Sequence, residues 1–234
     1  MNIISNEKLI RRNGKIAQYT GIAGLAVLAG GVFILVTRPQ SYGLVWVTVL
    51  VGFILSQVGI YFTNRWGRRP RPDEHINNAL KGLGDTYSIY HYTTPISHLL
   101  IGPAGIWVLL PHYQRGSITY ENGRWRQKGG GFLLGYMKMF GQEGLGRPDM
   151  EVGAEIDTVQ KFLKKCMPDA EPPAIQAALL FTDERVELNV DDAPTPTLKV
   201  KELKELIRKA AKGKPISSAR VKEIQEAVNQ KVKL

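Results

Sequence analysis

The chain has 234 residues, a formal net charge of +10 and one cysteine, Cys166, which excludes an intramolecular disulfide. Its length suits one folded domain with attachments. Residues 72–198 hold 11 Lys and Arg against 16 Asp and Glu, whereas residues 199–234 hold 11 against 4. Because non-specific affinity for nucleic acid depends on cations that neutralise phosphates, the acidic central region makes nucleic acid a less favoured partner.

Two uncharged apolar runs, residues 19–36 and 44–62, lie near the N-terminus. Each approaches the roughly 20 residues with which a helix crosses a bilayer. A signal peptide would need a cleavage site of small residues before a polar sequence, and two buried core helices would need a larger domain to cover them. The sequence therefore predicts a transmembrane helical hairpin over residues 19–63, with the lipid bilayer as a partner.

Basic residues flank both runs, while the short connecting loop carries Arg38 alone. The positive-inside rule then predicts a two-pass membrane protein with both termini cytoplasmic. Residues 1–18 are interpreted as a basic cytoplasmic tail, and residues 64–72 as a basic linker to the soluble domain. The arginines that follow the second run are candidates for contact with lipid or nucleic acid: Arg65, Arg68, Arg69 and Arg71.

After the linker, the apolar spacing predicts a helix over residues 73–83 and a strand over residues 87–92. Two apolar runs, residues 96–101 and 106–110, then flank the turn sequence Gly-Pro-Ala-Gly. This pattern predicts an antiparallel hairpin at the centre of a sheet.

The hairpin and its flanks resemble the signature of the nuclease-related domain (NERD) family, I-D-H-x-x-x-G-P-x-G-x-x-x-x-E-x-K followed by a glycine. Five scaffold positions match that signature: His98, Gly102, Pro103, Gly105 and Gly116. The family is similar in fold to the PD-(D/E)XK nucleases, in which an Asp, a Glu and a Lys at the ends of two adjacent strands hold a divalent metal and activate water. The resemblance implies an α/β fold over residues 73–212: a restriction-endonuclease-like central mixed β-sheet flanked by helices.

The chemical positions of the signature are replaced. Ser97 stands in place of the Asp, Leu110 in place of the Glu and His112 in place of the Lys, while Glu74 matches a glutamate near the start of the family's first helix. Serine and leucine supply no charged ligand for Mg²⁺. The resemblance implies a catalytically inactive domain without metal or cofactor, acting as a binding module for an unidentified protein partner at the membrane.

The alternative function is nucleic-acid binding or a residual PD-(D/E)XK-type nuclease activity, which would need Mg²⁺. Arg115, Arg124 and Arg126 are the candidate phosphate contacts in the soluble domain. Three histidines, His91, His98 and His112, fall on neighbouring predicted strands, but no Cys/His spacing matches a zinc motif, so no metal site is predicted.

The rest of the chain predicts a hairpin, two further strands, three helices and one ambiguous apolar segment. That segment, residues 132–140, is interpreted as core packing, with contact to the bilayer surface as the alternative. Cys166 has the spacing of a buried helix position. The remaining elements are a hairpin with an Asn-Gly turn over residues 117–127, a helix over 150–167, strands over 174–181 and 186–190, a helix over 201–211, and an amphipathic helix within 213–234.

Overall fold

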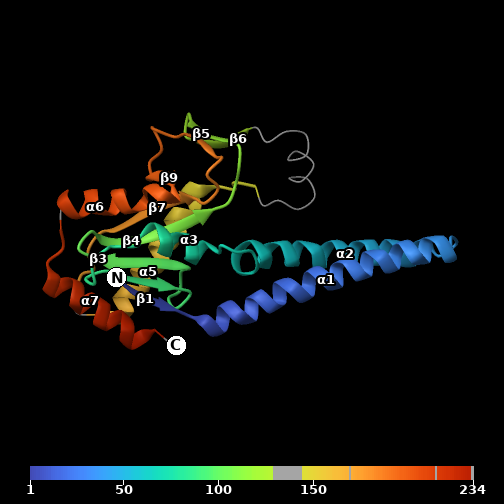
Figure 1. Ribbon diagram of the computed structural model, residues 1–234, viewed down its shortest axis with the longest axis horizontal. Coiled ribbons are helices and arrows are strands. Elements are labelled where there is room, and N and C mark those ends of the chain that lie inside the picture. Colours follow the sequence, from blue (N-terminus) through green and yellow to red (C-terminus); the bar gives the residue numbers. More distant parts are fainter. Residues whose placement is uncertain (129–143, 169, 214, 233–234) are drawn as a thin grey trace. The chain divides into compact units, whose positions relative to one another are not determined.

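The computed structural model describes residues 1–128, 144–168, 170–213 and 215–232. The described chain forms two compact units (Figure 1). The first, called the helical hairpin, is Glu7–Arg71, and the second, called the sheet domain, joins Met1–Asn6 to the chain from Pro72 onward.

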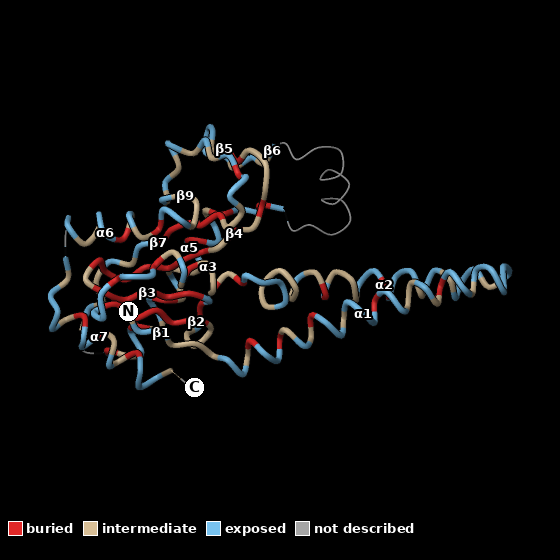
Figure 2. Tube along the Cα trace, viewed as in Figure 1, coloured by how far each residue is buried: buried red, intermediate tan, exposed pale blue. Residues whose placement is uncertain are grey.

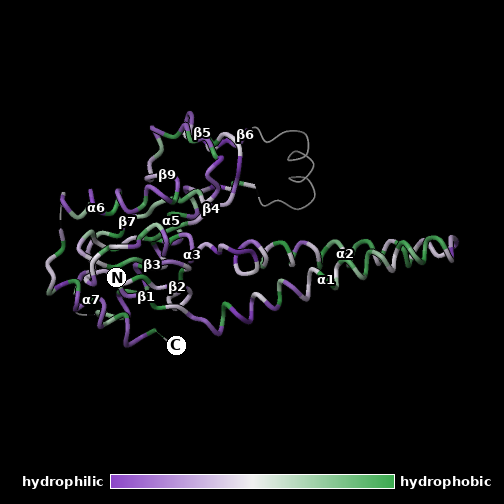
Figure 3. The backbone as a smooth tube through the Cα atoms, viewed as in Figure 1, coloured by the Kyte–Doolittle hydropathy of each residue, from purple (hydrophilic) through white to green (hydrophobic). Residues whose placement is uncertain are grey.

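The helical hairpin consists of α1 (Glu7–Thr37), α2 (Tyr42–Phe62) and a π-helical turn, η1 (Thr63–Gly67). Both α-helices are long and apolar enough to cross a membrane. Hydrophobic residues dominate α2 and the second half of α1, whereas the start of α1 is more hydrophilic, and most residues of both helices are exposed (Figures 2 and 3). The two predicted spans are therefore present as helices of the required length and composition.

Small residues line the contact between α1 and α2. A Cβ atom added at Gly24 would lie 2.9 Å from Ser56 Oγ, and one added at Gly59 would lie 3.1 Å from the backbone nitrogen of Gly21. The helices thus pack backbone against backbone at these positions, as is common between membrane helices.

The sheet domain contains a six-stranded mixed sheet in the order β1-β2-β3-β4-β7-β9. Strands β2, β3 and β4 are antiparallel neighbours, whereas β1 runs parallel to β2, and β7 runs parallel to both β4 and β9. The strands are β1 (Asn2–Ser5), β2 (Ser88–His91), β3 (His98–Gly102), β4 (Gly105–His112), β7 (Ile175–Phe181) and β9 (Thr197–Lys199).

Helices cover both faces of this sheet. Helices α5 (Pro148–Cys166) and α7 (Ser218–Lys231) contribute to the apolar cluster on one face, called the first core. Helices α3 (Pro72–Ala79) and α6 (Leu203–Gly213), the latter preceded by a 3-10 turn η2 (Val200–Glu202), contribute to the cluster on the other face, called the second core. Burial on both faces explains why the central strands are apolar at nearly every position (Figure 2).

A second, smaller sheet has the order β6-β5-β8. Its strands are β5 (Ser117–Glu121), β6 (Arg124–Lys128) and β8 (Glu187–Asn189). Asn122 and Gly123 connect β5 to β6 with positive φ angles of 52° and 71°, the conformation of a two-residue hairpin turn. The predicted hairpin is therefore present with its turn at the predicted residues.

The prediction that residues 1–18 form a tail is wrong. Asn2–Ser5 pairs with β2 as an edge strand of the main sheet, and α1 begins at Glu7, well before the predicted span. The helical hairpin is thus inserted in the chain between two elements of one domain, β1 and α3.

The boundary at the other end of the chain also changes. Residues 213–234 were expected to follow the folded domain, but α7 places Ile224 and Val228 in the first core. Strand β9 lies where the sequence predicts no strand. Cys166 is half-buried against the first core rather than fully buried, and the segment 132–140 lies outside the described residues.

Candidate functional site

The three replaced positions of the signature lie at one end of the main sheet. Ser97 immediately precedes β3, while Leu110 and His112 are near the end of β4. Because β3 and β4 are antiparallel, the start of one lies beside the end of the other. Ser97, immediately before β3, therefore lies beside Leu110 and His112 near the end of β4.

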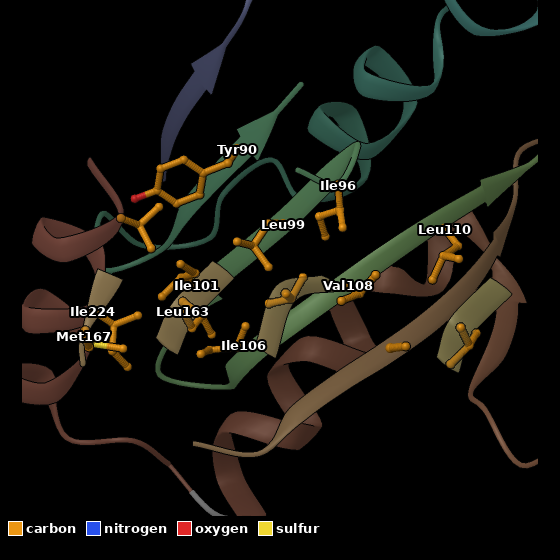
Figure 4. Packing of buried hydrophobic residues seen from close by; sticks show 14 of the residues in the cluster. Tyr90, Ile96, Leu99, Ile101, Ile106, Val108, Leu110, Leu163, Met167 and Ile224 are labelled. Atoms are coloured by element: carbon orange, nitrogen blue, oxygen red, sulfur yellow. The ribbon is translucent and has the colours of Figure 1, made fainter. Parts of the chain in front are cut away.

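Leu110 occupies an apolar environment. It is 5% exposed and belongs to the first core with Leu99, Val108 and Leu163 (Figure 4). A carboxylate at this depth would lose its hydration, so the surroundings suit the leucine and disfavour a charged metal ligand.

His112 is also enclosed, since it is 7% exposed and its ring stacks on Phe181 with 5.5 Å between ring centroids. Its Nε2 atom lies 3.7 Å from Glu151 Oε2, a carboxylate of α5 that is about half exposed. Ser97, in contrast, is exposed. The three side chains together supply a hydroxyl, an alkyl group and an imidazole, but no carboxylate.

Glu74 reaches this end of the sheet from the opposite face. It lies in the first turn of α3, whose Ile76 packs in the second core. One turn further along α3, Asn77 contacts His91 at the end of β2. The start of α3 is therefore at the same end of the sheet as Ser97, which makes Glu74 the one acidic signature position kept there.

His98 belongs to a buried polar cluster that the sequence did not reveal. The Nδ1 atoms of His91 and His98 lie 2.8 Å apart, and His91 Nε2 lies 3.0 Å from Asn77 Oδ1. Since an amide oxygen only accepts, the neutral pair has His91 donating from Nε2 to Asn77 and His98 donating from Nδ1 to His91. Burial, followed by the charge of His91, holds the pKa of His98 well below its usual value.

This histidine pair joins β2, β3 and α3, so its hydrogen bonds explain a structural role for the signature histidine. His91 and His98 face each other because they are register partners across the β2–β3 ladder. The sequence alone could have predicted this contact only if the register between β2 and β3 had been known. His112 lies on another strand pair, and the described residues contain no group of three or more His, Cys, Asp or Glu side chains able to hold a metal ion.

The glycines and the proline of the signature have conformational explanations. Gly105 and Gly116 have φ angles of 103° and 87°, which favour glycine, and a side chain at Gly102 would overlap the ring of Tyr87. The carbonyl of Pro103 accepts a hydrogen bond of 2.9 Å from the backbone of Ile216. Gly102, Pro103 and Gly105 therefore maintain the central hairpin, and Gly116 allows the turn that leads into β5.

The candidate arginines of the sheet domain divide into two kinds. Arg115 is held in an ion pair, with its Nε atom 2.6 Å from Asp183 Oδ2, whereas Arg124 and Arg126 are exposed on β6. Arg185 donates two further side-chain hydrogen bonds to Asp183, at 3.0 and 2.8 Å. The bonds from Arg185, with the nearby charge of Arg115, hold the pKa of Asp183 well below its usual range.

Asp183 therefore holds both Arg115 and Arg185 in ion pairs, and Arg115 has a structural partner. Among the arginines that follow α2, Arg68 and Arg69 are exposed and Arg65 is half-buried. Arg71 is only 9% exposed and presents little surface to a ligand.

Comparison with models of protein families, with curated proteins and with solved structures finds no match to this chain.

Proposed function

We propose that the protein is a two-pass membrane protein whose sheet domain is a NERD-like, PD-(D/E)XK-type fold that binds a protein partner and does not cut nucleic acid. One observation carries the proposal: the residues at the ends of β3 and β4, where that type of site would lie, include no carboxylate. The mixed sheet with helices on both faces also supports it.

The chemistry of the replaced positions supports a binding role. A metal-dependent nuclease needs carboxylates to hold Mg²⁺ beside the scissile phosphate. Leu110 is part of the hydrophobic core, and His112 is enclosed by Phe181. Glu74 is the one signature position that keeps a carboxylate, and one carboxylate is fewer than Mg²⁺ sites of this kind use.

Two long apolar helices, inserted as a hairpin between β1 and α3, support the membrane anchor. The cations lie at the ends of α1 and α2 that join the sheet domain, and the connecting turn carries only Arg38. By the positive-inside rule, this distribution supports a cytoplasmic sheet domain and two cytoplasmic termini.

A cleavage assay tests the proposal. Full-length protein in detergent, incubated with Mg²⁺ or Mn²⁺ and with single- and double-stranded DNA and RNA, should leave all four substrates intact. Metal-dependent cleavage that persists in Glu121→Ala, an exposed acid on β5, but is lost in Glu74→Ala would overturn it.

Nucleic-acid binding without cleavage is the second candidate, and one surface favours it. Arg124, Arg126 and Lys128 alternate along β6 and are all exposed, so they form a row of cations about 7 Å apart. Such a row suits successive phosphates. A gel-shift titration should then show nucleic-acid binding that weakens as the salt concentration rises. Binding should be lost in Arg124→Gln/Arg126→Gln and kept in the control Lys209→Gln. The absence of any shift at low salt would exclude this function.

A further inference from the structure

The end of the helical hairpin that joins the sheet domain carries seven cations on exposed or half-buried side chains, called here the basic collar. Glu7 is the only acidic residue in the segment 7–71. The collar comprises Lys8, Arg11, Arg12 and Lys15 on α1 with Arg65, Arg68 and Arg69 in and after η1.

Contacts within the helical hairpin place both halves of the collar at one level. A Cβ atom at Gly59 would lie 3.1 Å from the backbone nitrogen of Gly21, and one at Gly67 would lie 3.3 Å from Ala17 Cβ. Residues 17–21 of α1 are therefore level with the segment from the end of α2 through η1. The charged start of α1 extends past that level beside η1.

An aromatic cluster marks the same level. The rings of Tyr61, Phe62 and Trp66 pack together with centroids 5.3–6.1 Å apart, and Arg65 Cζ lies 4.0 Å from the centroid of the Tyr61 ring. Tyr19 adds an exposed ring from α1. Tyrosine and tryptophan concentrate where the hydrocarbon of a bilayer meets its headgroups, so this cluster locates the boundary along the hairpin.

The cations lie just beyond that boundary. At about 1.5 Å of rise per residue, Lys15 is about 6 Å past Tyr19, and Arg12 and Arg11 are about 10–12 Å past it. The headgroup layer is about 5–8 Å thick on each side of a bilayer. Lys15 thus lies among headgroups, and Arg11 and Arg12 lie within about one Debye length of them.

We infer that the basic collar binds the phosphate groups of anionic phospholipids and enriches these lipids around the helical hairpin. The inference rests on the proposed membrane anchor and adds the lipid class to it. Flanking charges by themselves explain only the orientation of a membrane protein. The aromatic cluster and the Arg65 guanidinium over the Tyr61 ring add features that are typical of contact with lipid headgroups. Each Lys or Arg near an anionic membrane surface contributes attraction that raises the binding constant by about fivefold.

The test uses the full-length protein reconstituted in vesicles of phosphatidylcholine and phosphatidylglycerol at a ratio of four to one. Copolymer-solubilised particles are isolated, and the share of phosphatidylglycerol around the protein is compared with the share in the parent vesicles. The collar variant is Arg11→Gln/Arg12→Gln/Arg68→Gln/Arg69→Gln. Its matched control, Lys201→Gln/Lys209→Gln/Lys212→Gln/Lys222→Gln, removes the same number of charges from exposed lysines of η2, α6 and α7.

The wild type and the control should be enriched in phosphatidylglycerol at least twofold, and the enrichment should disappear in the collar variant and in wild type prepared at 1 M salt. Absence of enrichment in the wild type, or its persistence in the collar variant, would overturn the inference while leaving the anchor intact. Release of the protein from vesicles by alkaline carbonate would instead overturn the anchor and this inference together.

Discussion

Substitution of Gly24 by alanine should loosen the helical hairpin, whereas the same substitution at Gly30 should not. The new Cβ atom at Gly24 would lie 2.9 Å from Ser56 Oγ, 3.1 Å from the Ser56 nitrogen and 3.4 Å from the Gly52 carbonyl oxygen. Comfortable contacts with carbon begin at about 3.5 Å, so α1 and α2 must separate by roughly 0.5 Å. Overpacking of this kind costs about 1–3 kcal/mol.

The control removes the effect of helix propensity. Alanine is favoured over glycine in a helix by about 1 kcal/mol at either position, but a Cβ atom at Gly30 would have no neighbour within 4 Å. The difference between the two variants therefore isolates the steric cost.

Amide hydrogen exchange of α1 peptides in detergent measures this difference. The Gly24→Ala variant should exchange about tenfold faster than Gly30→Ala, since 1.4 kcal/mol corresponds to a factor of ten. Equal exchange in the two variants would refute the packing of α1 on α2 through the glycine positions.

Three further predictions concern the sheet domain. Leu110→Ala should lower the free energy of unfolding by about 2–5 kcal/mol in a urea titration, because it empties a buried position of the first core, and a loss below 1 kcal/mol would contradict that burial. Asp183 has a lowered pKa in the folded state, so its stabilisation is present above the unfolded value of about 3.9 and is lost as pH falls below it. Asp183→Asn should therefore reduce Tm at pH 7 and flatten the loss of Tm between pH 5 and about 2. The exposed control Asp192→Asn should match the wild type. If the wild type and both variants have the same Tm at every pH, the ion pair is excluded as a source of stability. His98 also has a lowered folded pKa, so below about pH 6.5 the unfolded chain gains a proton that the folded chain resists, and stability falls as pH decreases. His98→Gln should flatten that decline between about pH 7 and pH 5, and an unchanged slope would show that the buried pair does not govern it.

Local patterns predicted the central hairpin and the Asn-Gly hairpin. The turn residues of both lie between short apolar or alternating runs, and the strands pair with their nearest neighbours in the chain. The amphipathic spacing likewise predicted α5 over nearly its observed length. In the structure, the antiparallel register of the central hairpin brings Ser97 beside the end of β4 that carries Leu110 and His112.

Long-range pairing accounts for what the sequence did not predict. Strand β1 has four residues and pairs with β2, from which the whole helical hairpin separates it in the sequence. Strand β9 has three residues and forms the opposite edge of the sheet. Parallel edge strands this short leave no local period to recognise. The Arg115–Asp183 ion pair and the His91–His98 pair depend on registers that only the folded sheet defines.

The side of the membrane on which the sheet domain lies tests the central claim most directly. In a Cys166→Ser background, single cysteines at Ser41, in the turn between α1 and α2, and at Ser217, at the start of α7, are exposed in intact cells to a membrane-impermeant maleimide. The cysteine at position 41 should react in intact cells, and the cysteine at position 217 only after lysis. Labelling at position 217 in intact cells, with position 41 protected until lysis, would contradict a cytoplasmic sheet domain anchored by a helical hairpin.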